Sequence, residues 1–428
     1  MTKYRDKFER ALLILVVFIL PTQLGLHFWP PFAFVFGIRV DYLAPTAHLT
    51  DVLLVLLLLT VFRKYFSKMK KLIIRNSLLI LTVLVLAIIN TALSTLPVVT
   101  FIKWVKIFEV SALAIYIWML DEKIKRFIIP TLYYSTIFFS MVGIGQFILG
   151  KTLGGALYLF GERSFDTTTP GIALTAINGI DYLRAYSTFP HPNALAGFLG
   201  ASILLTASFW KIRARRLIGL VVPVVCLMLT FSLAAIIGVV VCVLLWLIHI
   251  ANRNAGRIIK QLFALGILTS LLLPVYSKEL GTTLNVYGET VSQRLQLSLV
   301  AGKMVSERFL AGEGLNTFVI NVTRFVGFNT YSWTLQPVHN IFLLVFSETG
   351  VLGLLLLCLY FYKLLNILPA KNIYFSLAVT FVIVTGLIDH YWLTAQQNLL
   401  LIGLLTGLII SSGNVSLAIP KWNGKLKR

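Results

Sequence analysis

Blocks of about twenty apolar residues recur along the whole chain, and each block is long enough to cross a bilayer as a helix. Hydrophobic residues make up 58% of the 428 positions and charged residues only 12%. This composition predicts an all-α polytopic membrane protein of about 12 transmembrane helices in a single domain, residues 1–428. The expected spans cover residues 11–29, 48–62, 72–93, 98–120, 127–149, 193–210, 217–232, 233–251, 261–276, 339–362, 373–388 and 398–412.

The basic residues indicate how these spans are oriented. Most of the 37 Lys and Arg fall on the side of the two termini, for example in "RKYFSKMKK", "KIRARR" and the tail "KWNGKLKR". Because Lys and Arg concentrate in cytoplasmic loops, we expect an inner-membrane protein with both termini in the cytoplasm. The apolar run after Arg10 lacks a small-residue cleavage site, so we expect a retained first span. Topology thus explains the net charge of +21, and no nucleic-acid partner is predicted.

Two long polar insertions, residues 150–192 and 277–338, then face outward, and we expect them to contain short amphipathic helices. The outer face has no nucleotide sugars or nucleoside triphosphates. An enzyme working there needs a donor that is already activated and carried by the membrane.

The segment "QPVHNIFLLVFSETGVLG", residues 336–353, begins on the expected outer face and continues into a membrane span. His339 and Asn340 open the span, and Glu348 lies within its apolar run. Ionisable groups at membrane depth are costly and mark functional sites. We therefore predict that His339 is the catalytic residue and that Asn340 and Glu348 support it.

The first insertion ends in "RAYSTFPHPNALAGFLG". Pro190, Pro192 and Asn193 fit an ordinary helix start, with Asn193 as a capping residue. We also expect Asn193 to be one of the residues that support the site. Arg184 lies some nine residues before the span, where it either anchors to lipid headgroups or grips a phosphate with its planar guanidinium.

The second insertion contains "ETVSQRLQLSLVAGKMVSERF", which places Val291, Leu295, Leu299 and Gly302 at helical spacing. This pattern predicts an amphipathic helix in the membrane interface. Arg294 on this helix, like the later Arg308 and Arg324, is either a headgroup anchor or part of a basic cluster near His339.

The fourth span carries Lys103, Lys106 and Glu109 on roughly one helical face. One interpretation is an internal ion pair between Lys106 and Glu109. The other is that Lys106 lines a polar cavity that receives a lipid diphosphate, with Glu109 in support.

Taken in order, several of these segments resemble the O-antigen ligase and polymerase family of bacterial outer-face glycan enzymes. The matching elements lie between about residues 180 and 360: "RAYSTFPHPNALAGF", Arg294, "ERFLAGEGLNTF", His339-Asn340, Glu348-x-Gly350 and "VLGLL". One departure is visible, because members often have Ser-Arg at the start of the eighth span and this chain has Ser232-Leu233.

The resemblance implies transfer of an oligosaccharide from a polyprenyl diphosphate carrier to an acceptor glycan or lipid, without metal or other cofactor. Arg184 and Arg294 would hold the diphosphate and His339 would activate the acceptor. The residues allow this chemistry independently, since a neutral imidazole can take a proton from an attacking hydroxyl. A transporter or lipid-linked glycan flippase is the alternative, but the internal repeats typical of transporters are not evident. The sequence does not distinguish ligase from polymerase.

Overall fold

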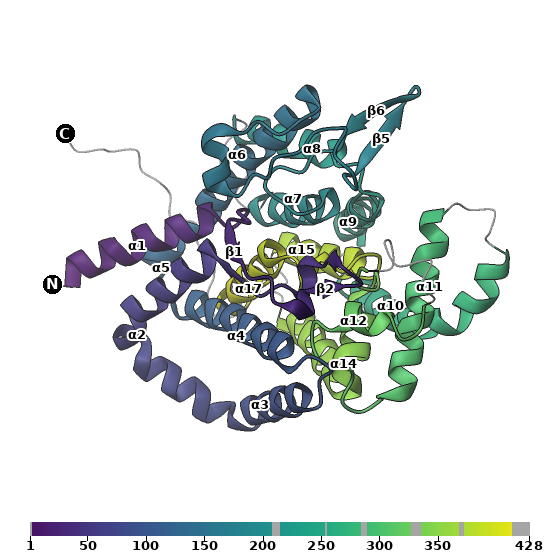
Figure 1. Ribbon diagram of the computed structural model, residues 1–428. Coiled ribbons are helices and arrows are strands. Elements are labelled where there is room, and N and C mark those ends of the chain that lie inside the picture. Colours follow the sequence, from purple (N-terminus) through teal and green to yellow (C-terminus); the bar gives the residue numbers. More distant parts are fainter. Residues whose placement is uncertain are drawn as a thin grey trace.

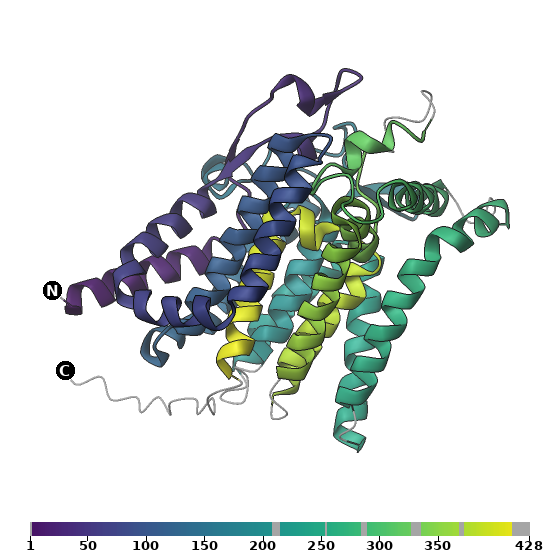
Figure 2. The same cartoon turned by 90° about the horizontal axis from the view of Figure 1, so that it is seen from below.

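A computed structural model describes residues 2–207, 215–252, 255–283, 289–326, 335–367 and 372–412. The described chain is mainly helical, and Figure 2 shows most of the long helices side by side with the short strands gathered at one end. The helices are α1 (Thr2–Phe18), α2 (Leu49–Arg75), α3 (Ser77–Ala92), α4 (Pro97–Met119), α5 (Glu122–Lys125), α6 (Ile128–Leu149), α7 (Pro192–Ala207), α8 (Arg215–Leu229), α9 (Leu233–Asn252), α10 (Ala255–Thr283), α11 (Glu289–Glu307), α12 (Phe318–Val322), α14 (Ile341–Ile367), α15 (Ile373–Gly386), α16 (Tyr391–Thr394) and α17 (Gln396–Ser412).

Four of the described helical segments are long and apolar enough to cross a membrane by themselves. A fifth candidate is the pair α2 and α3, which is bent by 81° at the break between them. The predicted count of 12 spans is therefore not confirmed. The expected break after residue 62 is wrong, because α2 continues as one helix through "RKYFSKMKK" to Arg75. The helix α4 is not one of the four apolar segments, because it carries three charged residues. Its bounds nevertheless match the predicted fourth span closely.

Several predicted boundaries agree with the helices. The expected spans at residues 127–149, 233–251 and 373–388 correspond to α6, α9 and α15. Parts of three sequence-based expectations lie outside the described residues: the "KIRARR" cluster, stretches of the second insertion, and the tail "KWNGKLKR".

The first insertion differs from the prediction. Within residues 150–192 the structure has a 3-10 helix, η3 (Gly155–Phe160), and a hairpin of β5 (Leu174–Ile177) and β6 (Ile180–Leu183), in place of an amphipathic α-helix. The hairpin turns at Asn178 and Gly179, both with positive φ, as a two-residue loop requires. Shorter elements, β1 (Gly25–His27), η1 (Pro31–Ala33), β2 (Phe34–Val35), β3 (Ile38–Arg39), η2 (Asp41–Leu43) and β4 (Thr46–His48), connect α1 to α2 (Figure 1).

The second insertion contains the predicted helix, α11, which is seen nearly end-on in Figure 2 and so lies across the direction of the main helices. Its buried face is partly different from the expected one. Leu297, Val300 and Met304 are buried, whereas Val291 is exposed. Gly302 lies against Pro274 of α10, because a Cβ at Gly302 would be 2.6 Å from the proline ring.

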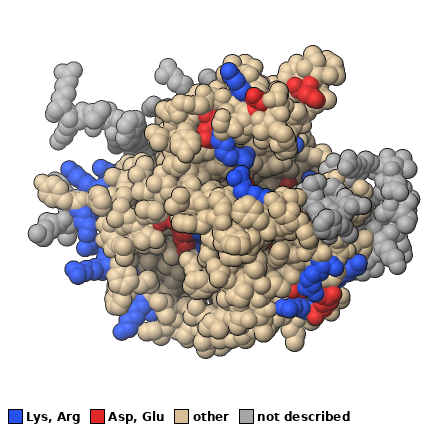
Figure 3. Space-filling view, in the orientation of Figure 1, with Lys and Arg blue, Asp and Glu red and all other residues tan. Residues whose placement is uncertain are grey.

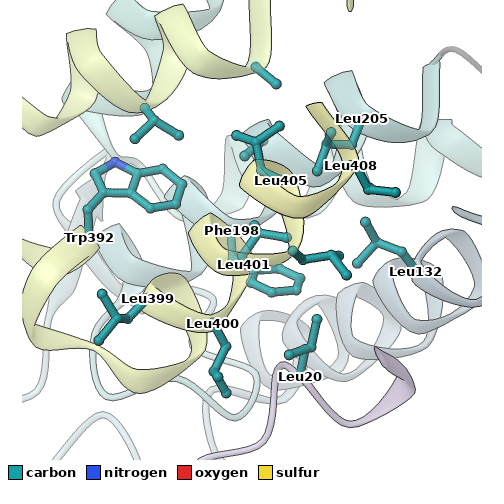
Figure 4. Packing of buried hydrophobic residues seen from close by; sticks show 14 of the residues in the cluster. Leu20, Leu132, Phe198, Leu205, Trp392, Leu399, Leu400, Leu401, Leu405 and Leu408 are labelled. Carbon is teal, nitrogen blue, oxygen red and sulfur yellow. The ribbon is translucent and has the colours of Figure 1, made fainter. Parts of the chain in front are cut away.

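The core forms where α17 packs on α4 and where α15 packs on α7 and α9. Gly407 of α17 lies directly against α4, since a Cβ there would be 2.6 Å from the carbonyl oxygen of Ala114. Small residues allow such close approach between membrane helices. Figure 4 shows Leu401 and Leu405 of α17 beside Phe198 of α7, with the Trp392 indole at the edge of the same cluster.

The helix α14 is broken at Gly350, whose φ of 69° and ψ of −171° are not helical. The break leaves the carbonyl oxygens of Ser347 and Glu348 without helical partners, and they accept the N–H groups of Glu313 and Gly314, each at 2.9 Å. The segment 308–318 therefore crosses α14 at the break and is fixed to it by backbone hydrogen bonds.

This crossing predicts a stability effect at Gly350. A Cβ at Gly350 would lie 2.1 Å from the carbonyl oxygen of Leu310, in a backbone region essentially reserved for glycine. We expect Gly350→Ala to destabilise the fold by more than about 3 kcal/mol, measured as a loss of thermal unfolding temperature in detergent. Gly154→Ala is the matched control, because Gly154 has similar backbone angles (φ 72°, ψ −157°) and nothing within 4 Å of its Cβ position. Equal losses in the two variants would show that backbone strain alone, and not the crossing, matters.

Candidate functional site

His339 is held at the start of α14 by its neighbour Asn340. The Asn340 side-chain oxygen accepts the N–H groups of Phe342 and Leu343, at 2.9 and 3.1 Å, and so caps the helix. Its amide nitrogen donates to the Ser270 hydroxyl and to the Leu387 carbonyl. Asn340 thus ties the segment bearing His339 to α10 and to the end of α15.

Asp389, which follows α15, is the centre of a buried polar network. It is only 3% exposed. One carboxylate oxygen accepts a hydrogen bond from Asn193 Nδ2 at 2.8 Å, and the other accepts the His390 N–H at 2.8 Å. Asn193 in turn accepts a hydrogen bond from the Arg184 guanidinium at 2.8 Å. The chain Arg184–Asn193–Asp389 therefore links two of the predicted site residues to an acid near His339.

Three predicted residues come together around Asp389. The nitrogen and oxygen atoms of His339, Asp389 and His390 that could bind a ligand lie within 4.8 Å of one another. The rings of His339 and His390 are 5.1 Å apart. Arg294 donates to the carbonyl oxygen of Ile388 at 3.3 Å, which places it next to Asp389 from the side of α11. His339, Arg184 and Arg294 thus lie around one carboxylate, although they come from three distant parts of the chain.

The electrostatics of this cluster favour a neutral imidazole beside an ionised acid. Burial lowers the pKa of His339 to about 3, and Arg294 and two neighbouring histidines lower it as well, while Asp389 opposes them. Burial raises the pKa of Asp389, but His339, His390 and Arg294 outweigh it and hold that pKa below its ordinary value. The Nδ1 atom of His339 is buried and has no hydrogen-bond partner among the described residues. A neutral imidazole with an unsatisfied nitrogen is suited to accept a proton from a bound hydroxyl.

His339 and Asp389 face a cavity of about 680 Å³ at the end of the bundle. Its wall also includes parts of the β1–β4 segment, α4, the first insertion and the start of α17, with the basic residues Arg39, Lys103, Lys106 and Arg163. Figure 3 shows blue and red side chains around the hollowed centre of one face, most of which is tan. Arg184 and Arg294 are not among the residues that line the cavity, whereas Asn193, which Arg184 contacts, is.

Lys106 lines this cavity but is not placed with the two arginines. It is paired with Asp51 of α2, while Glu109 is 3.9 Å away. Asp51 also accepts hydrogen bonds from the His48 N–H and from Gln396, both at 2.8 Å. Both interpretations of the sequence therefore hold in part: Lys106 is ion-paired within the protein, mainly to a different acid than expected, and it also faces a polar cavity.

Glu348 connects α14 to the segment that crosses it. Its two carboxylate oxygens accept the backbone N–H groups of Asn316 and Phe318, at 2.8 and 3.0 Å. Asn90 of α3 adds a hydrogen bond to the Glu348 carbonyl at 2.8 Å. The geometry gives Glu348 a positioning role in the loop after Gly314, away from the His339–Asp389 contact.

Asp389, His390 and Asp51 are the site residues that sequence reasoning did not single out. A signal was present for the first two, because "DHYWLTAQQ" was expected on the same outer side as His339. Asp51 is an isolated acid near the N-terminal end of an apolar run, which is the pattern that marks functional membrane residues.

The spacing of His339, Asp389 and His390 also resembles that of metal ligands. The donor set would allow a divalent cation, but Asp389 is already bonded to Asn193 and to the His390 N–H. Arg294 donates to the carbonyl oxygen of the adjacent Ile388 and lowers the pKa of Asp389, so a permanent positive charge already lies close to the carboxylate. This arrangement suits an imidazole and carboxylate pair better than a cation site.

The low pKa of His339 gives a prediction for pH dependence. A base must be neutral to act, so a lowered pKa extends activity toward acid, and we expect kcat/KM to stay high well below pH 6.5. A bound diphosphate is negative and raises the pKa of the imidazole, so the acid limb of kcat should lie at higher pH than that of kcat/KM. Initial rates between about pH 4.5 and 8 show whether kcat/KM stays high across this range and where the acid limb of kcat lies. An acid limb of kcat/KM near 6.5 would contradict the buried environment of His339.

Comparison with known proteins concerns the part of the chain from α8 to α14. A family model described as O-antigen ligase matches residues 218–358, about a third of the chain, and this range includes Arg294, His339 and Glu348. A search of curated proteins found no match. The family match agrees with the resemblance seen in the sequence, and residues 218–358 are similar to the O-antigen ligase family.

Proposed function

We propose that this protein transfers an oligosaccharide from a polyprenyl diphosphate carrier to an acceptor hydroxyl at the outer face of the cytoplasmic membrane, with both termini in the cytoplasm. The observation that supports it most is the meeting of His339, Arg184 and Arg294 around Asp389 at one end of the helix bundle. Such a transfer requires a base, a carboxylate that stabilises the protonated base, and cations that stabilise the leaving group.

His339 acts first in the proposed reaction. Its neutral imidazole takes the proton of the acceptor hydroxyl as the oxygen attacks the anomeric carbon of the donor sugar. The imidazolium that forms is stabilised by the neighbouring Asp389 carboxylate. General-base assistance of this kind contributes about 10² to 10⁴ in rate.

The arginines act on the leaving group. The bond between the anomeric carbon and the phosphate oxygen breaks, and the electron pair remains on the lipid diphosphate. Arg184 and Arg294 stabilise this developing negative charge, and each charged hydrogen bond is worth about 1.5 to 3 kcal/mol. The described contacts of Arg184 use its Nε and one terminal nitrogen, which leaves further N–H groups of its fork for a diphosphate.

The cavity supplies the space for the acceptor. Its wall contains His339 and Asp389, and its volume of about 680 Å³ falls within the range of small-molecule binding sites. Trp29, Tyr42 and Tyr158 in the same wall provide ring faces and polar edges that suit sugars.

The test uses the purified protein with a polyprenyl-diphosphate-linked oligosaccharide, first alone and then with candidate acceptor glycans or lipids. Mass spectrometry of the products distinguishes the outcomes: longer lipid-linked chains without added acceptor identify a polymerase, and a product that forms only with an acceptor identifies a ligase. Transfer should persist with a chelator present, because no step uses a metal. A transporter would instead move labelled donor across vesicle membranes, and would still do so after His339→Ala. Absence of any transfer product would refute the proposal.

A further inference from the structure

The second half of α2 differs from the first half in charge. Residues 52–61 contain no charged residue, whereas six basic residues follow within the same helix: Arg63, Lys64, Lys68, Lys70, Lys71 and Arg75. We call residues 62–75 the basic segment. It lies at the other end of α2 from Asp51, away from the cavity that contains His339.

One lysine of the basic segment occupies the acidic side chains beside it. Lys64 Nζ lies 2.7 Å from the carboxylate of Glu9, which is fully buried, and 3.1 Å from that of Asp6, both on α1. It also lies 3.4 Å from the carboxylate of Asp121, which precedes α5. Three acids from two neighbouring elements are therefore paired with a single cation.

The other cations of the basic segment are not neutralised in this way. Arg63, Lys70, Lys71 and Arg75 are exposed, and none of them forms an ion pair within the described ranges of the chain. Figure 3 shows blue side chains gathered along the left edge of the molecule, where Figure 1 places α1 and α2. This face therefore presents positive charge to its surroundings.

An exposed apolar stripe runs along the basic segment. Phe62, Phe66 and Ile73 are 49%, 48% and 46% exposed, and their spacing places them on one face of the helix. The rings of Phe62 and Phe66 are 5.4 Å apart. Arg63 and Lys70 are seven residues apart and lie on the adjacent face. An apolar stripe beside a basic face is typical of a helix that lies in the membrane interface.

The next helix fixes the direction of the basic segment. The helix α3 contains no charged residue, and α2 is bent by 81° relative to it. When α3 enters the hydrocarbon region, the basic segment therefore runs along the membrane surface. In this position the apolar stripe reaches the acyl chains and the cations reach the headgroups.

We propose that the basic segment binds anionic phospholipid, with its four unpaired cations on the headgroup phosphates and its apolar stripe between the upper parts of the acyl chains. Charge complementarity selects an anion, and the apolar stripe selects an amphiphile over a soluble polyanion such as nucleic acid. The inference does not depend on the proposed transfer reaction, because binding is measured without donor or acceptor.

The experiment compares two variants that lose the same number of exposed cations, one Arg and two Lys. The segment variant carries Arg63→Gln, Lys70→Gln and Lys71→Gln, and the control variant carries Lys123→Gln, Arg257→Gln and Lys363→Gln. Purified protein is equilibrated with equal amounts of phosphatidylglycerol and phosphatidylcholine, and native mass spectrometry counts the lipids that remain bound. We expect the wild type and the control to retain phosphatidylglycerol preferentially, and the segment variant to retain about tenfold less of it.

Two results of this experiment would overturn the proposal. One is equal retention of the two lipids by the wild type, and the other is an equal loss of phosphatidylglycerol in both variants. The second result would mean that any exposed cation on this side of the protein binds the lipid equally well.

Further measurements test the apolar stripe and the fold. Phe66→Gln leaves every charge in place, and we expect it to lower phosphatidylglycerol binding as well. Displacement of phosphatidylglycerol from the wild type by a short single-stranded oligonucleotide would overturn the proposal in favour of nucleic acid. In nanodiscs, phosphatidylglycerol should raise the unfolding temperature of the wild type and of the control more than that of the segment variant. An equal rise in all three proteins would contradict specific binding at the basic segment.

Discussion

Replacing His339 by alanine is expected to lower the rate of transfer by about 10² to 10⁴, the contribution of a general base. The reason is geometric, because the described structure places this imidazole in the wall of the cavity, next to Asp389 and close to the arginines. Donor binding should change little, since the diphosphate contacts are assigned to Arg184 and Arg294. The loss should therefore appear in kcat, measured by quenched assays with purified lipid-linked donor.

The control for this variant is His249→Ala. His249 lies near the C-terminal end of α9, whereas Ser232 precedes the N-terminal end of that helix. It should retain full transfer. Thermal unfolding of both variants checks that neither has lost its fold. Full activity of His339→Ala at saturating donor would remove this residue from the role of base.

Replacing Asp389 by asparagine is expected to lower kcat by on the order of 10², within the range of acid–base effects. Asparagine has the same shape and can still accept one hydrogen bond, but it carries no charge to stabilise the imidazolium. Because Asp389 raises the pKa of His339, its removal lowers that pKa further and makes the imidazole a weaker base. The remaining activity should therefore have an acid limb at lower pH than that of the wild type.

Asp166→Asn provides the comparison for the Asp389 variant. Asp166 belongs to the first insertion, and its carboxylate accepts hydrogen bonds only from Thr168 and Thr169 among the described contacts. Its loss should leave kcat and the pH profile unchanged. A wild-type pH profile in Asp389→Asn would mean that the carboxylate holds the loop together and does not act on His339.

Much of the site could be predicted because its members leave local signals in an apolar sequence. His339, Arg184 and Arg294 are polar residues near the ends of apolar blocks. Placing ionisable groups there costs free energy, and so their presence indicates a function. Their roles remain predictions, but the structure brings them to one carboxylate. The helices with clean apolar runs, such as α6 and α9, could be placed from the same pattern.

Other features depend on contacts that are not local in sequence. The ion pair of Lys106 joins α4 to Asp51 of α2, which lies 55 residues earlier in the chain. Helical spacing predicts only partners on the same helix, and so it indicates Glu109 and not Asp51. Propensity explains why α2 continues to Arg75, since Lys, Arg and Met favour helix even where their charge suggests a loop. The hairpin β5–β6 differs from the amphipathic helices that the polarity of the insertion predicts. Asn178-Gly179 is a strong signal for such a hairpin turn.

The break in α14 has a consequence for how the protein tolerates its surroundings. His339 is attached to the short N-terminal part, Ile341–Thr349, which Glu348 and the crossing segment hold in place. The longer C-terminal part begins beyond Gly350, and we expect it to be the part that tilts as bilayer thickness varies. Because Gly350 separates the two parts, we expect the imidazole to keep its distance to Asp389 when the lipid composition changes.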